Sequence, residues 1–111
     1  MAITINKGVL NSAAALTATA GAASMEVAPV KDSKTVYLFN NKDTKTLTVK
    51  VQGGEGWGAG NALTFDLTAG AEKVLLLDGS RFKKNDGKIY FEVSGGEGST
   101  VASLTVTAIQ I

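Results

Sequence analysis

Short runs of alternating apolar and polar residues, separated by turn residues about every ten positions, constrain the fold of this chain more than any other feature. Alternation with a period of two is typical of β-strands, because successive side chains point to opposite faces of a sheet. Leu47, Val49 and Val51 form one such face. Short strands at this spacing, with turns between them, are typical of an antiparallel sandwich or barrel.

The pattern predicts about seven or eight short strands and no strong helix between them, which argues against a parallel βαβ sheet. We therefore expect an all-β fold, an antiparallel β-sandwich of the jelly-roll or Ig-like kind. Turn residues at 40–45 predict a hairpin between the strands on either side. The run 74–77 is apolar throughout, which predicts a strand buried on both faces or lying at a sheet junction. The expected strands cover residues 3–5, 25–30, 35–39, 46–51, 63–67, 74–77, 89–93 and 101–111.

The stretch 12–24 is rich in Ala and Thr. Alanine favours helix, but Thr and Gly21 do not, and large apolar side chains do not recur at helical spacing. We expect an extended arm or edge strand over residues 1–24, followed by a β-sandwich domain over residues 25–111. Small side chains would let the arm lie close against another surface. The arm residues expected to make contacts are Leu16, Thr17 and Thr19.

A length of 111 residues suits a single domain. Eleven basic and ten acidic residues leave a formal charge of +1, and the two signs are interspersed. Nucleic-acid binders usually gather basic residues on one face, because phosphate neutralisation drives their affinity. No apolar run approaches the ~20 residues of a membrane-spanning helix. We expect neither nucleic acid nor membrane as a partner, and no cleaved signal peptide, because polar residues interrupt the small-residue run at 13–23.

The chain contains no cysteine and no histidine. This removes disulfides, thiolate metal ligands, the commonest general base and the commonest metal ligand. Asp66, Asp78 and Asp86 lie on different predicted elements, so spacing does not predict the carboxylate pair that a glycosidase needs. We expect no enzymatic activity, no catalytic residue, no cofactor and no metal.

Two segments, 53–56 and 95–98, share the sequence Gly-Gly-Glu-Gly. Glycine loops can present backbone N–H groups to phosphate, and Glu55 with Glu97 could bind a hard cation. However, neither segment is followed by the Lys and the helix of a phosphate-binding loop. We interpret both as turns at strand ends, at the same end of the sandwich.

Three larger side chains are candidates for contacts outside the predicted strand faces. Trp57 lies between two glycines, where an exposed indole could stack on a sugar or anchor a protein contact, or could fold back to cap the core. Arg81 could pair with Asp78, contact a neighbouring subunit or remain solvated. Phe82 is expected to anchor the polar turns on either side of it.

Four motifs follow the Ala/Thr-rich segment in a fixed order: 35–41 (TVYLFNN), 48–54 (TVKVQGG), 67–70 (LTAG) and 77–83 (LDGSRFK). This order resembles that of small proteins encoded in the head-gene clusters of tailed bacteriophages, over about residues 12–110. The resemblance implies a structural virion protein, a capsid decoration or other head-associated β-sandwich. It carries over no catalytic residues.

The resemblance also implies partners and a location. The partners would be the major capsid protein, further copies of the chain in a homo-oligomer such as a trimer, or both. The protein would be made in the host cytoplasm and end on the capsid surface of the virion. The alternative hypothesis is an adhesion or carbohydrate-binding sandwich module, suggested by Trp57. Against it, most aromatic residues alternate into strand cores, whereas sugar platforms use several exposed rings.

Overall fold

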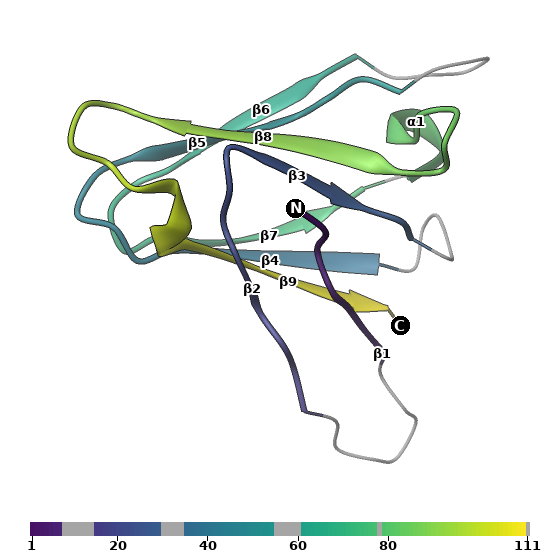
Figure 1. Cartoon of the computed structure of the whole chain (residues 1–111), viewed down its shortest axis with the longest axis horizontal. Coiled ribbons are helices and arrows are strands. Elements are labelled where there is room, and N and C mark those ends of the chain that lie inside the picture. Colours follow the sequence, from purple (N-terminus) through teal and green to yellow (C-terminus); the bar gives the residue numbers. More distant parts are fainter. Residues whose placement is uncertain (8–14, 30–34, 55–60, 78, 111) are drawn as a thin grey trace.

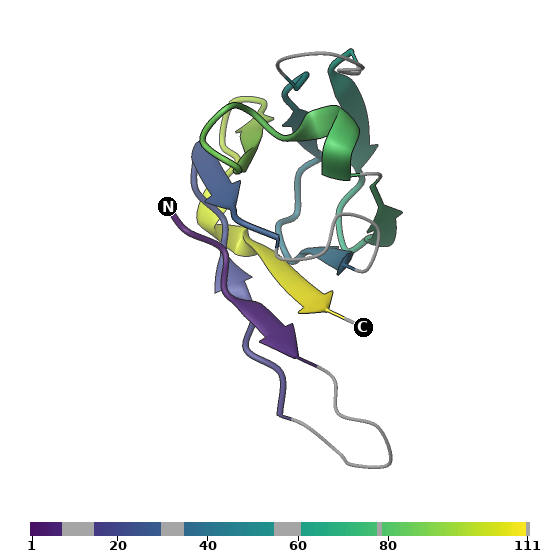
Figure 2. The same cartoon turned by 90° about the vertical axis from the view of Figure 1, so that its right-hand side faces the viewer.

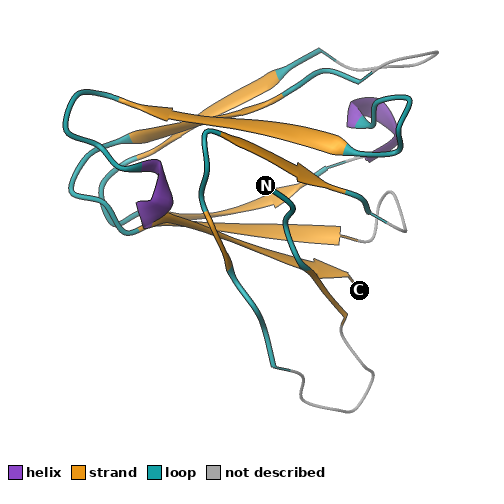
Figure 3. Ribbon diagram, viewed as in Figure 1, coloured by secondary structure: helices purple, strands orange, loops and turns teal. Residues whose placement is uncertain are grey.

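Two β-sheets pack face to face around one apolar core (Figures 1 and 3). The computed structural model describes residues 1–7, 15–29, 35–54, 61–77 and 79–110. The five-stranded sheet has the order β1-β9-β4-β7, with β2 also pairing with β9, and the four-stranded sheet has the order β3-β8-β5-β6. The elements are β1 (Ile5–Lys7), β2 (Thr19–Ala20), β3 (Ser24–Val27), β4 (Thr35–Asn41), β5 (Leu47–Val51), β6 (Leu63–Leu67), β7 (Glu72–Leu76), α1 (Gly79–Phe82), β8 (Ile89–Gly95), η1 (Val101–Ser103) and β9 (Leu104–Gln110).

The predicted all-β antiparallel sandwich is confirmed. Among the described residues, each strand pair is antiparallel except β1 with β9, which is parallel. Strands β1 and β2, which lie within the expected arm of residues 1–24, both pair with β9. The described part of residues 12–24 is extended or irregular and contains no helix, as expected from its Thr content.

The alternating apolar residues point inward and form the core. Three aromatic contacts join the two sheets: Tyr37 with Phe91 (ring centroids 5.6 Å apart), Phe39 with Phe91 (5.9 Å) and Phe39 with Phe65 (5.2 Å). Burial raises the pKa of Tyr37 to about 12, because the phenolate form is disfavoured away from water. These aromatic pairs fix which strands of one sheet lie over which strands of the other.

The hairpin predicted at residues 40–45 is wrong. Strands β4 and β5 lie in different sheets, so the connection crosses from one sheet to the other. The buried Asn41 side chain accepts a hydrogen bond from the Asp43 backbone N–H (2.9 Å) and donates to the backbone carbonyls of Lys45, Leu67 and Thr68 (2.9, 2.9 and 3.2 Å). This asparagine stabilises the crossover, and a turn signal alone does not distinguish a crossover from a hairpin.

The burial predicted for the run 74–77 is also wrong. Strand β7 lies at one edge of the five-stranded sheet, and its outward-facing Val74 and Leu76 are 63% and 72% exposed. Leu75 is half-buried on the inner face, and Leu77 is buried just beyond the strand end. A continuous apolar run is typical of a strand covered on both faces, but here nothing in the described chain covers the outer face.

The described first glycines of the two Gly-Gly-Glu-Gly segments, Gly53 and Gly95, lie at opposite ends of the sandwich, in contrast to the prediction. Strands β5 and β8 are antiparallel neighbours, so Leu47 at the start of β5 pairs with Gly95 at the end of β8. The end of β5 therefore lies beside the start of β8, and Gly53 leaves the sheet at the end away from Gly95. A repeated turn sequence shows that two strands end in similar turns, but it does not show whether the two strands run in the same direction.

The N-terminal segment closes one side of the sandwich, which we call the closed side. Residues 1–3 run along β3, with the Ile3 N–H donating to the Glu26 carbonyl (2.8 Å) and the Glu26 N–H to the Met1 carbonyl (2.9 Å). The chain then crosses to the other sheet, where β1 pairs with β9, and Ile3 is buried between the sheets. The predicted division into an arm of residues 1–24 and a body of residues 25–111 stays a prediction.

On the opposite side, which we call the open side, the edge strands β6 and β7 each pair with a single neighbour. They are joined by the turn 68–71, in which the Ala71 N–H donates to the Thr68 carbonyl (2.9 Å) and Gly70 has a φ of 73°. This left-handed conformation favours glycine. Figure 2 shows β1 and β3 at one side of the molecule and β6 and β7 at the other.

Candidate protein-contact surfaces

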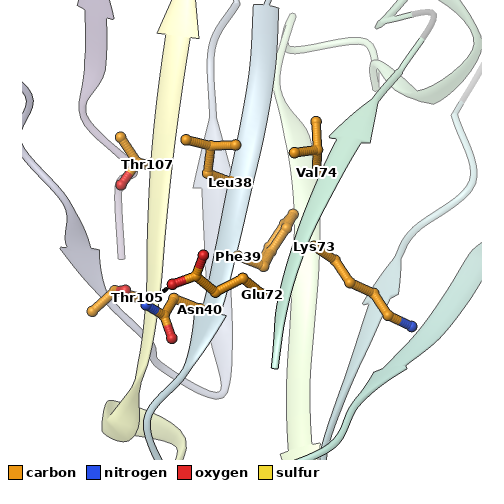
Figure 4. Close-up of a pocket in the computed structure, with 8 residues that line it drawn as sticks. All are labelled: Leu38, Phe39, Asn40, Glu72, Lys73, Val74, Thr105 and Thr107. Atoms are coloured by element: carbon orange, nitrogen blue, oxygen red, sulfur yellow. Dashed lines mark hydrogen bonds between the residues drawn. The ribbon is translucent and has the colours of Figure 1, made fainter. Parts of the chain in front are cut away.

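The outer face of the five-stranded sheet carries three cross-strand rows of side chains, one residue each from β9, β4 and β7. The strand register defines the rows, because directly paired residues share a face. Figure 4 shows two of the rows, with Leu38 lying between Thr107 and Val74, and Asn40 lying between Thr105 and Glu72. The rows are Thr105–Asn40–Glu72, Thr107–Leu38–Val74 and Ile109–Val36–Leu76.

The rows change from polar to apolar along the strands. In the first row the Asn40 amide donates to the Glu72 carboxylate (3.0 Å). The second row is mixed, and the third is entirely aliphatic, with Leu76 mostly exposed and Val36 half-buried. The first two rows line a shallow hollow of about 350 Å³. We call the five aliphatic residues of the second and third rows the apolar face.

The outer face of the four-stranded sheet differs in composition. Its outward residues on β5, β6 and β8 are polar or charged, and the Thr48 hydroxyl donates to the Asp66 carboxylate (2.8 Å). Such a face is well solvated and needs no partner. The outward residues are Thr48, Lys50, Thr64, Asp66, Tyr90, Glu92 and Ser94.

A cleft of about 240 Å³ opens between β6 and β7 on the open side. Phe65 and Leu75 are half-buried in it, and Leu63 is 38% exposed at its mouth. Lys73 faces inward from β7, opposite Phe39, yet its side chain is exposed. The inter-sheet space is thus partly open to solvent along this side, and its lining is mainly apolar. We call this space the edge cleft.

A buried amide adds to the backbone pairing of β1 and β2 with β9 that attaches the arm to the body. The Asn6 side chain donates to the carbonyls of Thr17 and Ala108 (both 2.9 Å) and accepts from the Thr17 N–H (2.7 Å). The Thr4 N–H donates to the Thr19 hydroxyl (3.1 Å). Of the three predicted arm contacts, Thr17 and Thr19 are therefore engaged within the chain.

Leu16, the third predicted arm residue, has a different environment. Its side chain is 53% exposed, and its neighbours Ala15, Thr17 and Ala18 are exposed as well. Figures 1 and 2 show this part of the chain extending away from the two sheets. An exposed leucine on a projecting segment is available for contact with another molecule.

Two of the remaining predicted contact residues, Arg81 and Phe82, lie at the end of the sandwich where β5 finishes. Arg81 is exposed in the short helix α1, and Phe82 is half-buried against the core, which agrees with an anchoring role. Gly54 passes so close to α1 that a Cβ there would lie 2.5 Å from the Arg81 carbonyl oxygen. Trp57 and Asp78 lie outside the described residues.

A second hollow of about 350 Å³ lies near this end, on the outer side of β8, and is lined by Gln52, Lys84, Asn85, Asp86 and Tyr90. The Tyr90 hydroxyl donates to Asp86, and the Lys84 ammonium lies 5.9 Å from the centre of the Tyr90 ring. The Tyr90 hydrogen bond, with others, lowers the pKa of the Asp86 carboxyl. Apart from Tyr90, the residues that line the hollow have polar or charged side chains, and the hollow is open to solvent.

The sequence interpretation missed Leu63, Val74 and Leu76 as surface residues. The apolar run at 74–77 is the available signal, but such a run predicts a strand buried on both faces or lying at a sheet junction. Recognising the surface required the sheet order, which places β7 at an edge.

Among the described residues, no three His, Cys, Asp or Glu side chains gather where they could hold a metal ion. Neither helix in the described part of the chain has the length and apolar character needed to span a bilayer. A scan against known protein families and searches of characterised proteins and of solved structures find no match to this chain.

Proposed function

We propose that this chain is a structural virion protein that decorates or stabilises the capsid of a tailed bacteriophage through protein–protein contacts. The observation that carries the proposal is the apolar face, where Val74 and Leu76 are mostly exposed beside Val36 and Leu38. Exposed apolar patches on a soluble domain mark surfaces that bind another protein. The major capsid protein is the proposed partner for this face.

The contrast between the two outer faces supports an oriented attachment. The polar face of the four-stranded sheet suits contact with water, whereas the apolar face would gain free energy by being covered. A protein attached to a capsid shell would place an apolar surface against the shell and a polar surface toward water. The order of motifs in residues 35–83, which resembles that of phage head-cluster proteins, supports the same function.

Co-sedimentation with purified heads of the phage that encodes the chain tests this proposal. The wild-type chain is expected to sediment with the heads, and the double variant Val74→Ser/Leu76→Ser to bind at least about tenfold more weakly, because two exposed aliphatic side chains are lost. The control is Thr64→Ser, on the outer face of the other sheet. Failure of the wild type to sediment with either empty or filled heads would contradict the proposal.

The second candidate is the adhesion or carbohydrate-binding module, favoured by the hollow around Tyr90. An aromatic ring beside amide and carboxylate groups is the kind of lining that sugars bind. However, Lys84 lies over the Tyr90 ring and Asp86 occupies its hydroxyl, which leaves less of the ring for stacking. On a glycan array, binding that is lost in Tyr90→Ala and in Trp57→Ala would support this function, and a blank array for the wild type would exclude it.

A further inference from the structure

The exposed large apolar side chains of the described residues fall mainly into two groups on opposite sides of the molecule. Leu16 lies on the arm, beyond the closed side, and Leu63, Val74 and Leu76 lie on the open side. Met1 is the remaining exposed one. Each group leaves apolar surface in contact with water in a single copy, and one contact between copies would cover Leu16 and part of the other group.

The closed side shows how an extended segment completes this sandwich. Residues 1–3 bond to the edge of β3 and place Ile3 between the sheets, where it is buried. The open side lacks an equivalent segment among the described residues, and the edge cleft lies in the corresponding position between β6 and β7. Its lining by Leu63, Phe65 and Leu75 suits an aliphatic side chain entering between the sheets.

The two edges of the open side differ in how readily they accept a strand. Strand β7 points Lys73 inward, and an inward-facing charge on an edge strand disfavours the addition of another strand there. The inward residues of β6 are Leu63, Phe65 and Leu67, which carry no charge. Strand β6 is therefore the edge that can accept an extended segment through its backbone.

We propose that the arm of one copy docks along β6 of a second copy, with Leu16 entering the edge cleft. The described arm residues Ala15–Ala20 carry no charge, so docking would bury no unpaired charged group. Lys73 can keep its ammonium group in water at the rim of the edge cleft. The arm belongs to the edge of the five-stranded sheet farthest from β7, so it projects away from its own cleft. The docking rests on the proposed structural function and names a second copy as one partner.

A contact between an arm and a cleft is head-to-tail, because the two surfaces differ. Such a contact closes into a ring if the rotation between copies allows it and otherwise extends as a filament. A ring would place every apolar face in the same orientation relative to its axis, which is the arrangement that attachment to a shell requires.

Because the chain has no cysteine, engineered thiols report this contact without background. A mixture of the single variants Leu16→Cys and Leu63→Cys, mildly oxidised, is expected to give a disulfide-linked dimer containing one of each. The matched control replaces Leu63→Cys with Thr64→Cys, which is adjacent in β6 but faces outward. Little or no cross-linked product, or equal yields with both cleft-side variants, would overturn the proposal.

Sedimentation equilibrium provides the second measurement. Leu16→Asp is expected to weaken self-association of the wild-type chain by at least about tenfold, because a carboxylate would have to enter an apolar cleft. Leu16 is mostly exposed, so the fold tolerates the change. A wild-type chain that binds phage heads but remains monomeric and uncross-linked would overturn the docking and leave the proposed function standing. Cross-linking without head binding would do the reverse.

Discussion

The closed side and the open side of the sandwich each end in strand edges, but the chain covers these edges only on the closed side. On the closed side, residues 1–7 cover the edges of β3 and β9 and bury Ile3 between the sheets. On the open side, β6 and β7 stay uncovered by the described chain, Val74 faces solvent, and Leu63 is partly exposed at the mouth of the edge cleft. An uncovered edge with apolar residues is a surface for a partner unless charge protects it.

Each side has a buried asparagine of its own that joins separate segments of the chain. Asn6 joins the arm to β9 on the closed side, and Asn41 joins the crossover to the end of β6, next to the turn that connects the open-side strands. Each amide acts as an additional peptide group, donating to backbone carbonyls and accepting from a backbone N–H. Asn41 joins segments of the sandwich body, whereas Asn6 joins the arm to β9. Substitution of Asn41 should therefore lower the free energy of unfolding more than substitution of Asn6.

The largest effect is expected for Asn41→Ala. Three carbonyls would lose their donor and the Asp43 N–H its acceptor, in a fully buried place, which we expect to lower the free energy of unfolding by about 4 kcal/mol. Urea denaturation measures this loss. The neighbouring Asn40→Ala, which removes only an exposed bond to Glu72, is the control and should change it by less than about 0.5 kcal/mol. Equal losses would mean that the crossover does not depend on the buried amide.

Ile3→Ala should give the next largest effect and tests the closure directly. Truncation of a buried isoleucine costs about 3 kcal/mol, through lost burial and the cavity left behind. The matched change on the open side is Leu63→Ala, expected to cost about 1 kcal/mol in a single copy because the side chain is only partly covered, being 38% exposed. If both cost the same, the two sides would not differ in the way that we describe.

Asn6→Ala should have a smaller effect, about 1–2 kcal/mol, concentrated in the arm. The amide proton of Thr17, which donates to Asn6, is expected to lose its protection against hydrogen exchange. Asn6→Asp keeps an acceptor for that proton but loses both donated bonds, so Thr17 should stay partly protected while stability still falls. Unchanged exchange at Thr17 in Asn6→Ala would show that other contacts hold the arm.

The sequence predicted the sandwich because alternation along β5, β8 and β9 is a local property that burial then reinforces, as at Leu47 and Val106. It did not predict which strands are neighbours. Residues 40–45 form a crossover and not a hairpin because the Asn41 amide donates to the carbonyls of Leu67 and Thr68. These two residues are distant from Asn41 in the sequence. The exposure of Val74 likewise depends on the position of β7 in the sheet, which no local pattern encodes.

The smallest effect we expect is that of acid acting through Asp43, which lies in the connection between β4 and β5. The hydrogen bond from the Thr100 backbone N–H (2.7 Å) holds the pKa of the Asp43 carboxyl below its ordinary 3.8. A carboxyl with a depressed pKa in the folded state stabilises the fold at pH values above its unfolded pKa. That contribution is lost as the pH falls through the lower, folded value.

Unfolding measured from pH 7 downward should therefore show a stable plateau, followed by a decline that begins near the unfolded pKa of the carboxyl groups. Asp43→Asn removes one ionisable group and should make the decline shallower, with Asp66→Asn, on the outer face of the four-stranded sheet, as the control. Asn6 and Asn41 do not ionise in this range, so protection of Thr17 should persist until global unfolding. Loss of that protection before the decline would show that the attachment of the arm depends on an acidic group, such as Glu26, which pairs with the N-terminal ammonium of Met1 (3.1 Å).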